Sequence, residues 1–292
     1  TSAKNFIPEI DGLRFIAIFT VLLFHFHFQL IKSFQDLTVF DFEDTGFWSA
    51  GWWFVRLDLG VKVFFGISGF ILSIPFFNQY WFNGKNVELK SYFIRRLTRL
   101  EPPFIIALTG FLLVHLFVLK EQSFGELFPH YLASLFYLHT LIFNAYSTIL
   151  PVTWSLETEV QFYLIIPFLA SWILTSGGKG RALFLGVVLL IFSVLFRSFM
   201  LTEGVYGLLA SLPAFLSYFL VGIGFAYVYL TRLTWLKVKN WLWDVGFLLA
   251  FVGLFVFYKP QSDPMRQVFF CLSMFILFIG VFKGKFSNWI MT

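Results

Sequence analysis

Long apolar stretches, separated by short charged connections, recur along this whole sequence and restrict its fold more than any other feature. Charged residues make up only 13% of the 292 residues and hydrophobic residues make up 59%, whereas a soluble domain is about 25% charged. Mean hydropathy is +0.80. Because a run of roughly 20 apolar residues can cross a bilayer as a helix, the pattern predicts an all-α, polytopic transmembrane helical bundle.

The apolar stretches predict eight or nine membrane crossings. The candidate segments are 12–31, 59–77, 102–119, 131–146, 156–174, 182–201, 208–230, 241–258 and 267–282. The connection 32–58 carries five acidic and two basic residues, whereas 78–101 carries five basic and two acidic residues. Since basic connections remain in the cytoplasm, we expect 78–101 and the N-terminus to be cytoplasmic.

The charges of the later connections disagree with this count by one crossing. Two segments lie between the expected outside position near Glu121 and the expected inside position near Lys179, where an alternating path needs one. A re-entrant or broken helix around 150–159 would remove the disagreement. Irregular backbone at membrane depth is tolerated only inside protein or beside a water-filled cavity, so such a break would also mark a site.

The overall charge excludes little else. The net charge is +5, which basic cytoplasmic loops explain, and we expect no nucleic-acid partner. The single cysteine, Cys271, excludes an internal disulfide. We expect no metal, because no pair of histidines has clear ligand spacing. We expect a structural role, as polar groups bonded to neighbouring residues, for His27, His115, His130 and His139.

The run TWSLETEVQFYL at 153–164 places Glu157 and Glu159 at the start of an apolar segment. A carboxylate at the edge of hydrocarbon is costly and needs a partner, so it is a functional candidate. Two plainer interpretations remain open. Acidic residues in a first helical turn interact favourably with the helix dipole, with Ser155 as the expected N-cap, and either carboxylate could belong to a structural ion pair.

A cation and an imidazole occupy the first apolar segment. Arg14 and His25 are eleven residues apart, about three helical turns and 16 Å, so they share one helix face. An imidazole titrates near neutral pH and can act as a general base. The open alternative for His25 is a structural hydrogen bond to a neighbouring helix.

Two further runs carry candidate binding residues. Arg96 and Arg99, three apart in SYFIRRLTRLEPPF, share a helix face and are either a topology anchor or a clamp for phosphate, which guanidinium groups bind bidentately. Ser68 and Gly69 lie in GVKVFFGISGFIL, where small residues permit close helix packing or leave a slot for a narrow ligand. Arg197, near one end of its segment, is expected to snorkel.

Four blocks in this order resemble the acyltransferase 3 family of integral-membrane acyltransferases. They are IDGLRFIAIFTVLLFHF, GVKVFFGISGFIL, RRLTRLEPP and WSLETEVQFYLIIP, within 10–167. The resemblance implies transfer of an acyl group, often acetyl, from cytoplasmic acyl-CoA to a hydroxyl, commonly on an extracytoplasmic carbohydrate or lipid-linked sugar. It implies location in a bacterial inner (plasma) membrane, in contact with membrane lipid.

The resemblance also assigns residues. The family's Arg-x10-His motif maps onto Arg14 and His25, and its Trp-Ser-Leu-x-x-Glu motif maps onto Trp154, Ser155 and Glu159, which favours Glu159 over Glu157. It implies that His25, Glu159 and Arg14 are catalytic. The residues expected to contact the acyl donor are Arg96, Arg99, Ser68, Gly69, Trp154 and Ser155.

The hypothesis that follows is acyl transfer with CoA phosphates held by Arg96 and Arg99, near Arg14. His25 would take a proton from the acceptor hydroxyl or carry the acyl group itself, and Glu159 would orient the imidazole, as a carboxylate does in a triad. The competing interpretation is a transporter in which Arg14, His25 and Glu159 form a proton or substrate relay. A third is a sensor without catalysis.

One departure from the family concerns the C-terminal end. Family members continue into further apolar segments, one of which carries a Ser-Tyr-x-x-Tyr-Leu-x-His-like run, and this sequence ends at Thr292 without it. We therefore expect residues 1–292 to be a single integral-membrane acyltransferase domain that lacks C-terminal spans.

Overall fold

The chain is helical throughout its described part. The computed structural model describes residues 7–33, 49–120, 122–175, 178–231, 239–258 and 264–291, and these residues contain helices, turns and irregular connections but no strand. The all-α class expected from the sequence is therefore confirmed. Glu121, Arg232, Lys237 and most of the acidic connection 32–58 lie outside the described residues.

The chain divides into two compact units. The first unit contains residues 1–71 and 218–292, and the second contains residues 72–217. Helices α3 (Leu59–Trp81) and α10 (Leu212–Leu230) each contribute to both units.

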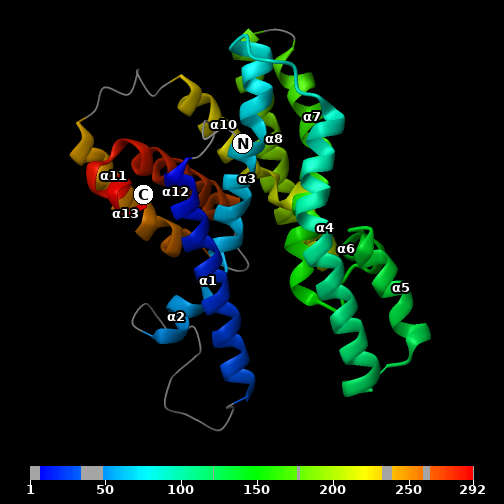
Figure 1. The fold of residues 1–292 in the computed structure, drawn as a ribbon. Helices are drawn as coiled ribbons and strands as arrows, with labels where there is room; N and C mark the ends of the chain where they lie inside the picture. Colours follow the sequence, from blue (N-terminus) through cyan, green and yellow to red (C-terminus); the bar gives the residue numbers. More distant parts are fainter. Residues whose placement is uncertain are drawn as a thin grey trace. The chain divides into compact units, whose positions relative to one another are not determined.

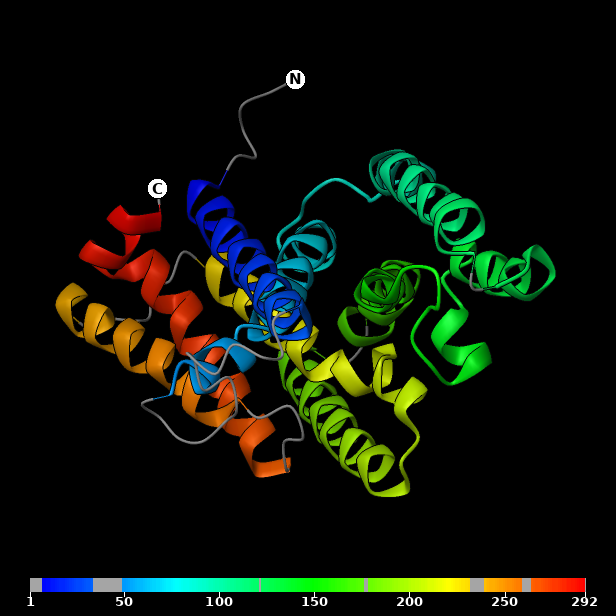
Figure 2. The ribbon, with the colours of Figure 1, turned by 90° about the horizontal axis from the view of Figure 1, so that it is seen from below.

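The first unit is held together by helices from the two ends of the sequence. It contains α1 (Pro8–Ser33), α2 (Ala50–Val55), the first half of α3, most of α10, α11 (Asn240–Phe257), α12 (Pro264–Lys283) and α13 (Lys285–Met291). Figure 2 shows α11 and α12 side by side. The Asn288 amide donates to Glu9 over 3.0 Å, so α13 is bonded to the first turn of α1.

Glycines allow the backbones of α3 and α10 to touch where the two helices cross. A Cβ atom added at Gly222 would lie 1.8 Å from the carbonyl oxygen of Gly66, and one at Gly69 would lie 2.2 Å from that of Phe219. Close backbone approach through small residues is a common way for membrane helices to associate. Aromatic rings surround this crossing, with Phe65 stacked on Phe219 at 4.8 Å.

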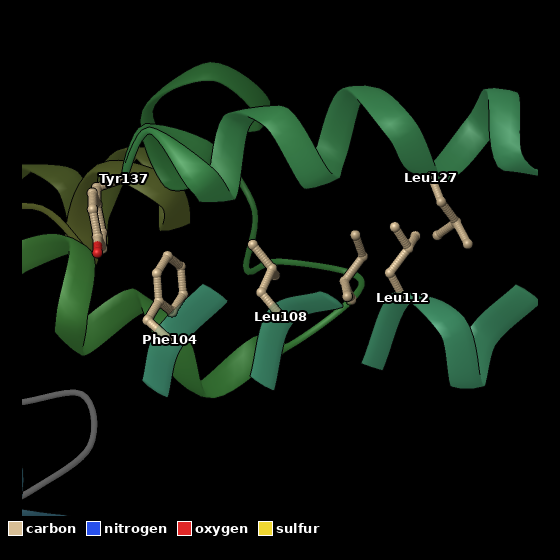
Figure 3. Close-up of a cluster of buried hydrophobic side chains, with 6 residues drawn as sticks. Phe104, Leu108, Leu112, Leu127 and Tyr137 are labelled. Atoms are coloured by element: carbon tan, nitrogen blue, oxygen red, sulfur yellow. The ribbon is translucent and has the colours of Figure 1, made fainter. Parts of the chain in front are cut away.

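The second unit begins with a long helix and a second helix that returns beside it. Helix α4 (Leu89–Val114) continues as the π-helical turn η2 (His115–Leu119), and α5 (Phe124–Leu135) runs back along it (Figure 1). A capping box formed by Ser123 and Glu126 starts α5. Buried side chains join the two helices, with Leu127 beside Leu112 at one end and Tyr137 beside Phe104 at the other (Figure 3).

Irregular backbone follows α5 before the next long helix. The short α6 (His139–Phe143) and the 3-10 turn η3 (Pro151–Thr153) lead into α7 (Trp154–Leu174), which is followed by α8 (Gly178–Glu203) and α9 (Tyr206–Leu209). Tyr137 and Asn144 adopt left-handed backbone conformations, with φ of 59° and 50°. Such strain is held only where the surroundings fix it, and here it reverses the chain twice between α5 and η3.

Seven described helices are long and apolar enough to cross a membrane, against the eight or nine crossings expected. They are Pro8–His27, Gly51–Trp81, Leu89–Leu119, Gly178–Glu203, Gly207–Leu230, Asn240–Phe257 and Pro264–Lys283. The expected segment 131–146 is broken between α5 and α6, both of which are too short to span. The expected segment 156–174 forms the 21-residue α7, whose first half is made polar by Glu157, Glu159 and Gln161.

Candidate active site

The residues predicted from the sequence fall in both units. The first unit contains Arg14, His25, Ser68 and Gly69, and the second contains Arg96, Arg99, Trp154, Ser155 and Glu159.

In the first unit, α1 presents Arg14 and His25 in different settings. Arg14 forms an ion pair with Asp11 one turn earlier, with Nη1 and Oδ1 3.0 Å apart. The His25 side chain is exposed and packs edge-on against Phe24, with ring centroids 5.3 Å apart. The imidazole is therefore open to its surroundings and is not enclosed by packed hydrocarbon. The buried imidazole of this helix is His27, stacked on Phe54 of α2 at 4.6 Å.

Ser68 and Gly69 lie in the buried middle of α3. The contact of Gly69 with the backbone of Phe219 favours the packing role of these small residues. The alternative, a slot that admits a narrow ligand, stays a prediction.

A buried polar cluster at the start of α3 was not anticipated from the sequence. The Lys62 ammonium lies 2.5 Å from Asp58 Oδ2, and the Tyr258 hydroxyl donates to the same oxygen over 2.6 Å. Lys62 is 5% exposed, so its charge depends on this partner. The signal that was available is an Asp-Lys pair at i and i+4, the spacing of helical ion pairs.

In the second unit, the two carboxylates of α7 have different partners. Glu157 is completely buried, and its Oε2 accepts the backbone N–H of Thr140 at 3.0 Å and the Thr140 hydroxyl at 2.9 Å. Glu159, also buried, accepts a hydrogen bond from the Tyr163 hydroxyl. Glu157 therefore anchors α6, whereas Glu159 is bonded within its own helix.

The expected N-cap of α7 is corrected by the structure. The helix begins at Trp154 with Thr153 in the capping position, and Ser155 is its second residue. The Ser155 hydroxyl donates to the carbonyl of Val152 over 3.2 Å. The 3-10 turn before the helix moves the start by two residues, because Thr153 bonds back to the carbonyl of Leu150. The indole of Trp154 packs against Phe215, with ring centroids 5.2 Å apart.

Arg96 and Glu159 belong to one cluster. The Arg96 guanidinium lies 6.0 Å from the ring centroid of Tyr92 and 5.8 Å from that of Tyr163, whose hydroxyl bonds Glu159. The Tyr92 hydroxyl donates to the carbonyl oxygen of Tyr163 over 3.2 Å. Tyr163 therefore lies between the proposed phosphate-binding cation and the proposed catalytic carboxylate, a link that the sequence analysis missed.

Arg99 is exposed and Arg96 is half-buried, although the two share a helix face as expected. An exposed guanidinium beside a half-buried one is compatible with a clamp at the edge of the helices. The binding of phosphate by this pair stays a prediction.

Two histidines, one on each side of the break between α5 and α6, are joined by hydrogen bonds whose donors and acceptors can be assigned. His139 is completely buried, its Nδ1 lies 3.1 Å from the carbonyl oxygen of Ala145, and its Nε2 lies 2.8 Å from Nδ1 of His130. A carbonyl only accepts, so His139 Nδ1 donates, and His139 Nε2 then accepts from His130. This assignment leaves a lone pair on His130 Nε2, so His130 has the form of a base. Burial lowers the pKa of His139.

From the sequence, only a structural role was expected for both imidazoles. Nine residues separate them, and only the break between α5 and α6 brings their rings to 5.0 Å. No group of three or more metal-ligating side chains occurs within the described ranges.

An all-α chain with seven described helices that are long and apolar enough to cross a membrane has the architecture of a polytopic membrane protein. The model of the acyltransferase domain family, acyltransferase 3, matches residues 7–292. The chain therefore belongs to this family of acyltransferase enzymes.

Similar proteins are O-acetyltransferases by name. The chain is 27% identical over 175 residues to the peptidoglycan O-acetyltransferase OatA of Listeria monocytogenes, and 26% identical over 182 residues to the O-acetyltransferase OatA of Staphylococcus aureus. It is 30% identical over 176 residues to a putative O-acetyltransferase of Staphylococcus aureus. These matches cover 56–59% of this chain but only 24–26% of the relatives. No solved structure matches the chain.

Proposed function

We propose that this protein transfers an acetyl group from acyl-CoA to a hydroxyl of a carbohydrate acceptor. Membership of the acyltransferase family over residues 7–292 carries the proposal. The relatives named as O-acetyltransferases support acetyl as the group and a hydroxyl as its acceptor, and the two named OatA favour a cell-wall or other polysaccharide.

An eighth crossing by α7 supports an inside-to-outside path. If α7 spans together with the seven helices above, while α5 and α6 do not, the basic positions 85–99, 179–181, 232–239 and 283–285 all fall on the side of the N-terminus. By the positive-inside rule this side is the cytoplasm. The donor would then arrive from the cytoplasm of a bacterium and the acceptor from outside its plasma membrane.

The residues have separate tasks in this proposal. Arg96 and Arg99 bind CoA phosphates, and the neighbouring Tyr163 holds Glu159 in position. His25 takes the proton of the attacking hydroxyl or carries the acyl group. In the overall reaction the thioester C–S bond breaks, an ester C–O bond forms, and the proton of the hydroxyl ends on the released thiol of CoA.

Transfer of radiolabelled acetyl from acetyl-CoA to polysaccharide fragments, by the purified chain in lipid nanodiscs, tests the proposal. General base catalysis contributes about 10²–10⁴-fold, so His25→Ala should lose about this factor. His115→Ala, at the half-buried first position of η2, is the matched control and should retain the wild-type rate. Full transfer by a correctly inserted His25→Ala variant would reject the role of His25.

A paired measurement addresses the donor site. The double substitution Arg96→Ala and Arg99→Ala should weaken acetyl-CoA binding at least tenfold, because two charge-assisted contacts are lost. Unchanged affinity would exclude the clamp. The transporter alternative predicts no release of free CoA under any condition, and family membership favours the enzyme.

A further inference from the structure

Arg197 is a buried cation that has no counter-ion among the described residues. It lies six residues before the end of α8 and is only 7% exposed, so the expected snorkelling does not occur. Its Nε and Nη1 atoms are buried and make no hydrogen bond with any described residue. Burial of an unpaired charge costs several kcal/mol, so a guanidinium in this state indicates an anion that the described residues do not provide.

The ring of Phe215 connects Arg197 to Trp154, the first residue of the Trp-Ser-Leu-x-x-Glu motif. The guanidinium lies 5.0 Å from the ring centroid of Phe215, and the Trp154 indole also packs against this ring, at 5.2 Å. A cation–π contact is worth about 0.5–2 kcal/mol, but it satisfies no N–H donor. The Nε and Nη1 donors of Arg197 are thus available to a ligand, next to a ring that also packs on Trp154.

A second unused donor approaches the same turn of α10. Gln161 Oε1 accepts the backbone N–H of Leu212 over 2.9 Å, and the Gln161 amide nitrogen is buried without a partner. Gln161 thus bonds the first residue of α10, and Arg197 contacts the ring of Phe215 three residues later in the same helix. Both unsatisfied groups donate, and the first turn of the 19-residue α10 adds a partial positive charge.

One acceptor is also unused nearby. Glu157 lies one turn before Gln161 on the same face of α7, and its Oε1 is buried without a hydrogen bond. Donors for an anion next to an acceptor for a hydroxyl match a sugar that carries both groups. Guanidinium recognises carboxylate and phosphate alike, through parallel hydrogen bonds.

We propose that Arg197, assisted by Gln161, binds the anionic group of an acidic carbohydrate, the acyl acceptor. The inference rests on the proposed function for the reaction but not for the binding. In the eight-crossing arrangement, the end of α8 and the start of α10 lie on the side opposite the basic connections. That side receives the acceptor, so an acceptor carboxylate or phosphate, and not a phosphate of CoA, is the expected ligand.

Substitution of Arg197 by methionine separates binding from structure. Arg197→Met should raise KM for an acidic glycan about 10- to 100-fold, the loss of one charged hydrogen-bonded contact, and leave KM for acetyl-CoA unchanged. It should also remove the preference for this glycan over its carboxyl-reduced form. Since an unpaired buried charge is removed, the ligand-free variant should unfold at the same or a higher temperature than wild type.

Arg95→Met, an exposed arginine of α4, is the control and should leave KM for the glycan unchanged. A rise in KM for acetyl-CoA in place of the glycan would assign Arg197 to the donor phosphates and overturn the proposal. Unchanged kinetics with a lower unfolding temperature would make Arg197 a structural group and would also overturn it.

Wild-type protein provides a test that needs neither a folded variant nor turnover. A ligand that binds only the folded state raises its unfolding temperature. N-acetylmuramic acid, which has a carboxylate, should raise it, whereas the matched neutral sugar N-acetylglucosamine should not. Equal effects of the two sugars would refute the anion site. If wild type binds the acidic sugar but never releases CoA from acetyl-CoA, the proposed function fails while this site stands.

Discussion

The crossing of α3 and α10 makes a sharp quantitative prediction. A methyl group added by Gly222→Ala would lie 1.8 Å from the carbonyl oxygen of Gly66, and also 2.6 Å from the backbone nitrogen of Phe70. Real Cβ atoms essentially never approach closer than 3.0 Å, so the two helices must separate by about 1.2 Å. Backbone atoms cannot turn aside as a side chain can, and the whole contact must loosen.

The expected cost is that of overpacking, about 1–3 kcal/mol. Gly186→Ala on α8 is the matched control, because nothing lies within 4 Å of the added methyl. Alanine is favoured over glycine in a helix by about 1 kcal/mol, so the control should be neutral or stabilising. Gly222→Ala gains the same helix propensity, so the two variants should differ by the overpacking cost alone, about 1–3 kcal/mol in the free energy of unfolding, and by at least about 2 °C in unfolding temperature.

The single cysteine provides the assay. Cys271 is buried in the first unit, which also contains the crossing, so a fluorogenic maleimide should react with it only as this unit opens. The apparent unfolding temperature is measured in detergent at one fixed heating rate, because membrane proteins often unfold irreversibly. A Gly222→Ala protein as stable as Gly186→Ala would refute the backbone contact.

Three other predictions concern the second unit. Tyr163→Phe should reduce kcat for acetyl transfer about 10- to 150-fold, since a hydrogen bond to a charged group contributes about 1.5–3 kcal/mol, whereas Tyr92→Phe should cost much less; equal losses would contradict the role of Tyr163 beside Glu159. Thr140→Val should destabilise the protein by about 1–3 kcal/mol in thermal unfolding followed by circular dichroism, because a buried carboxylate loses a donor; an unchanged midpoint would disprove the anchor. Burial lowers the pKa of His139 below 6.5, so protons bind the unfolded chain more tightly and stability falls as the pH drops below about 6.5. His139→Phe should lack this part of the pH dependence, and identical profiles would contradict it.

The interpretation of Arg197 shows where reasoning from the sequence reached its limit. Position near the end of an apolar segment correctly describes Arg197, and snorkelling is the usual consequence. The ring beside it, Phe215, comes from α10, and no local pattern specifies which side chains a neighbouring helix presents. The same reason applies to the His130–His139 pair, which depends on a chain reversal between α5 and α6.

The two carboxylates of α7 illustrate a finer distinction. Both were visible as costly groups at the start of an apolar segment, and the family motif favoured Glu159. The structure adds that Glu157 is bonded to Thr140 of another element, whereas Glu159 is bonded to Tyr163, whose ring lies near Arg96. The sequence spacing of two residues could not assign these partners, because it places the carboxylates on different sides of the helix without saying what each side meets.

The sequence alone determined that this chain is an all-α membrane protein with most of its spans in the expected places, because hydropathy and charge are sums over neighbouring residues. It also determined the Arg14–His25 spacing and the motif that begins α7. Only the tertiary structure decided that 131–146 is broken between two short helices, that α3 and α10 touch through glycine, and that Arg197 is buried with no counter-ion among the described residues. Each of these depends on which surfaces distant segments bring together, and packing between segments is not a property of either segment by itself.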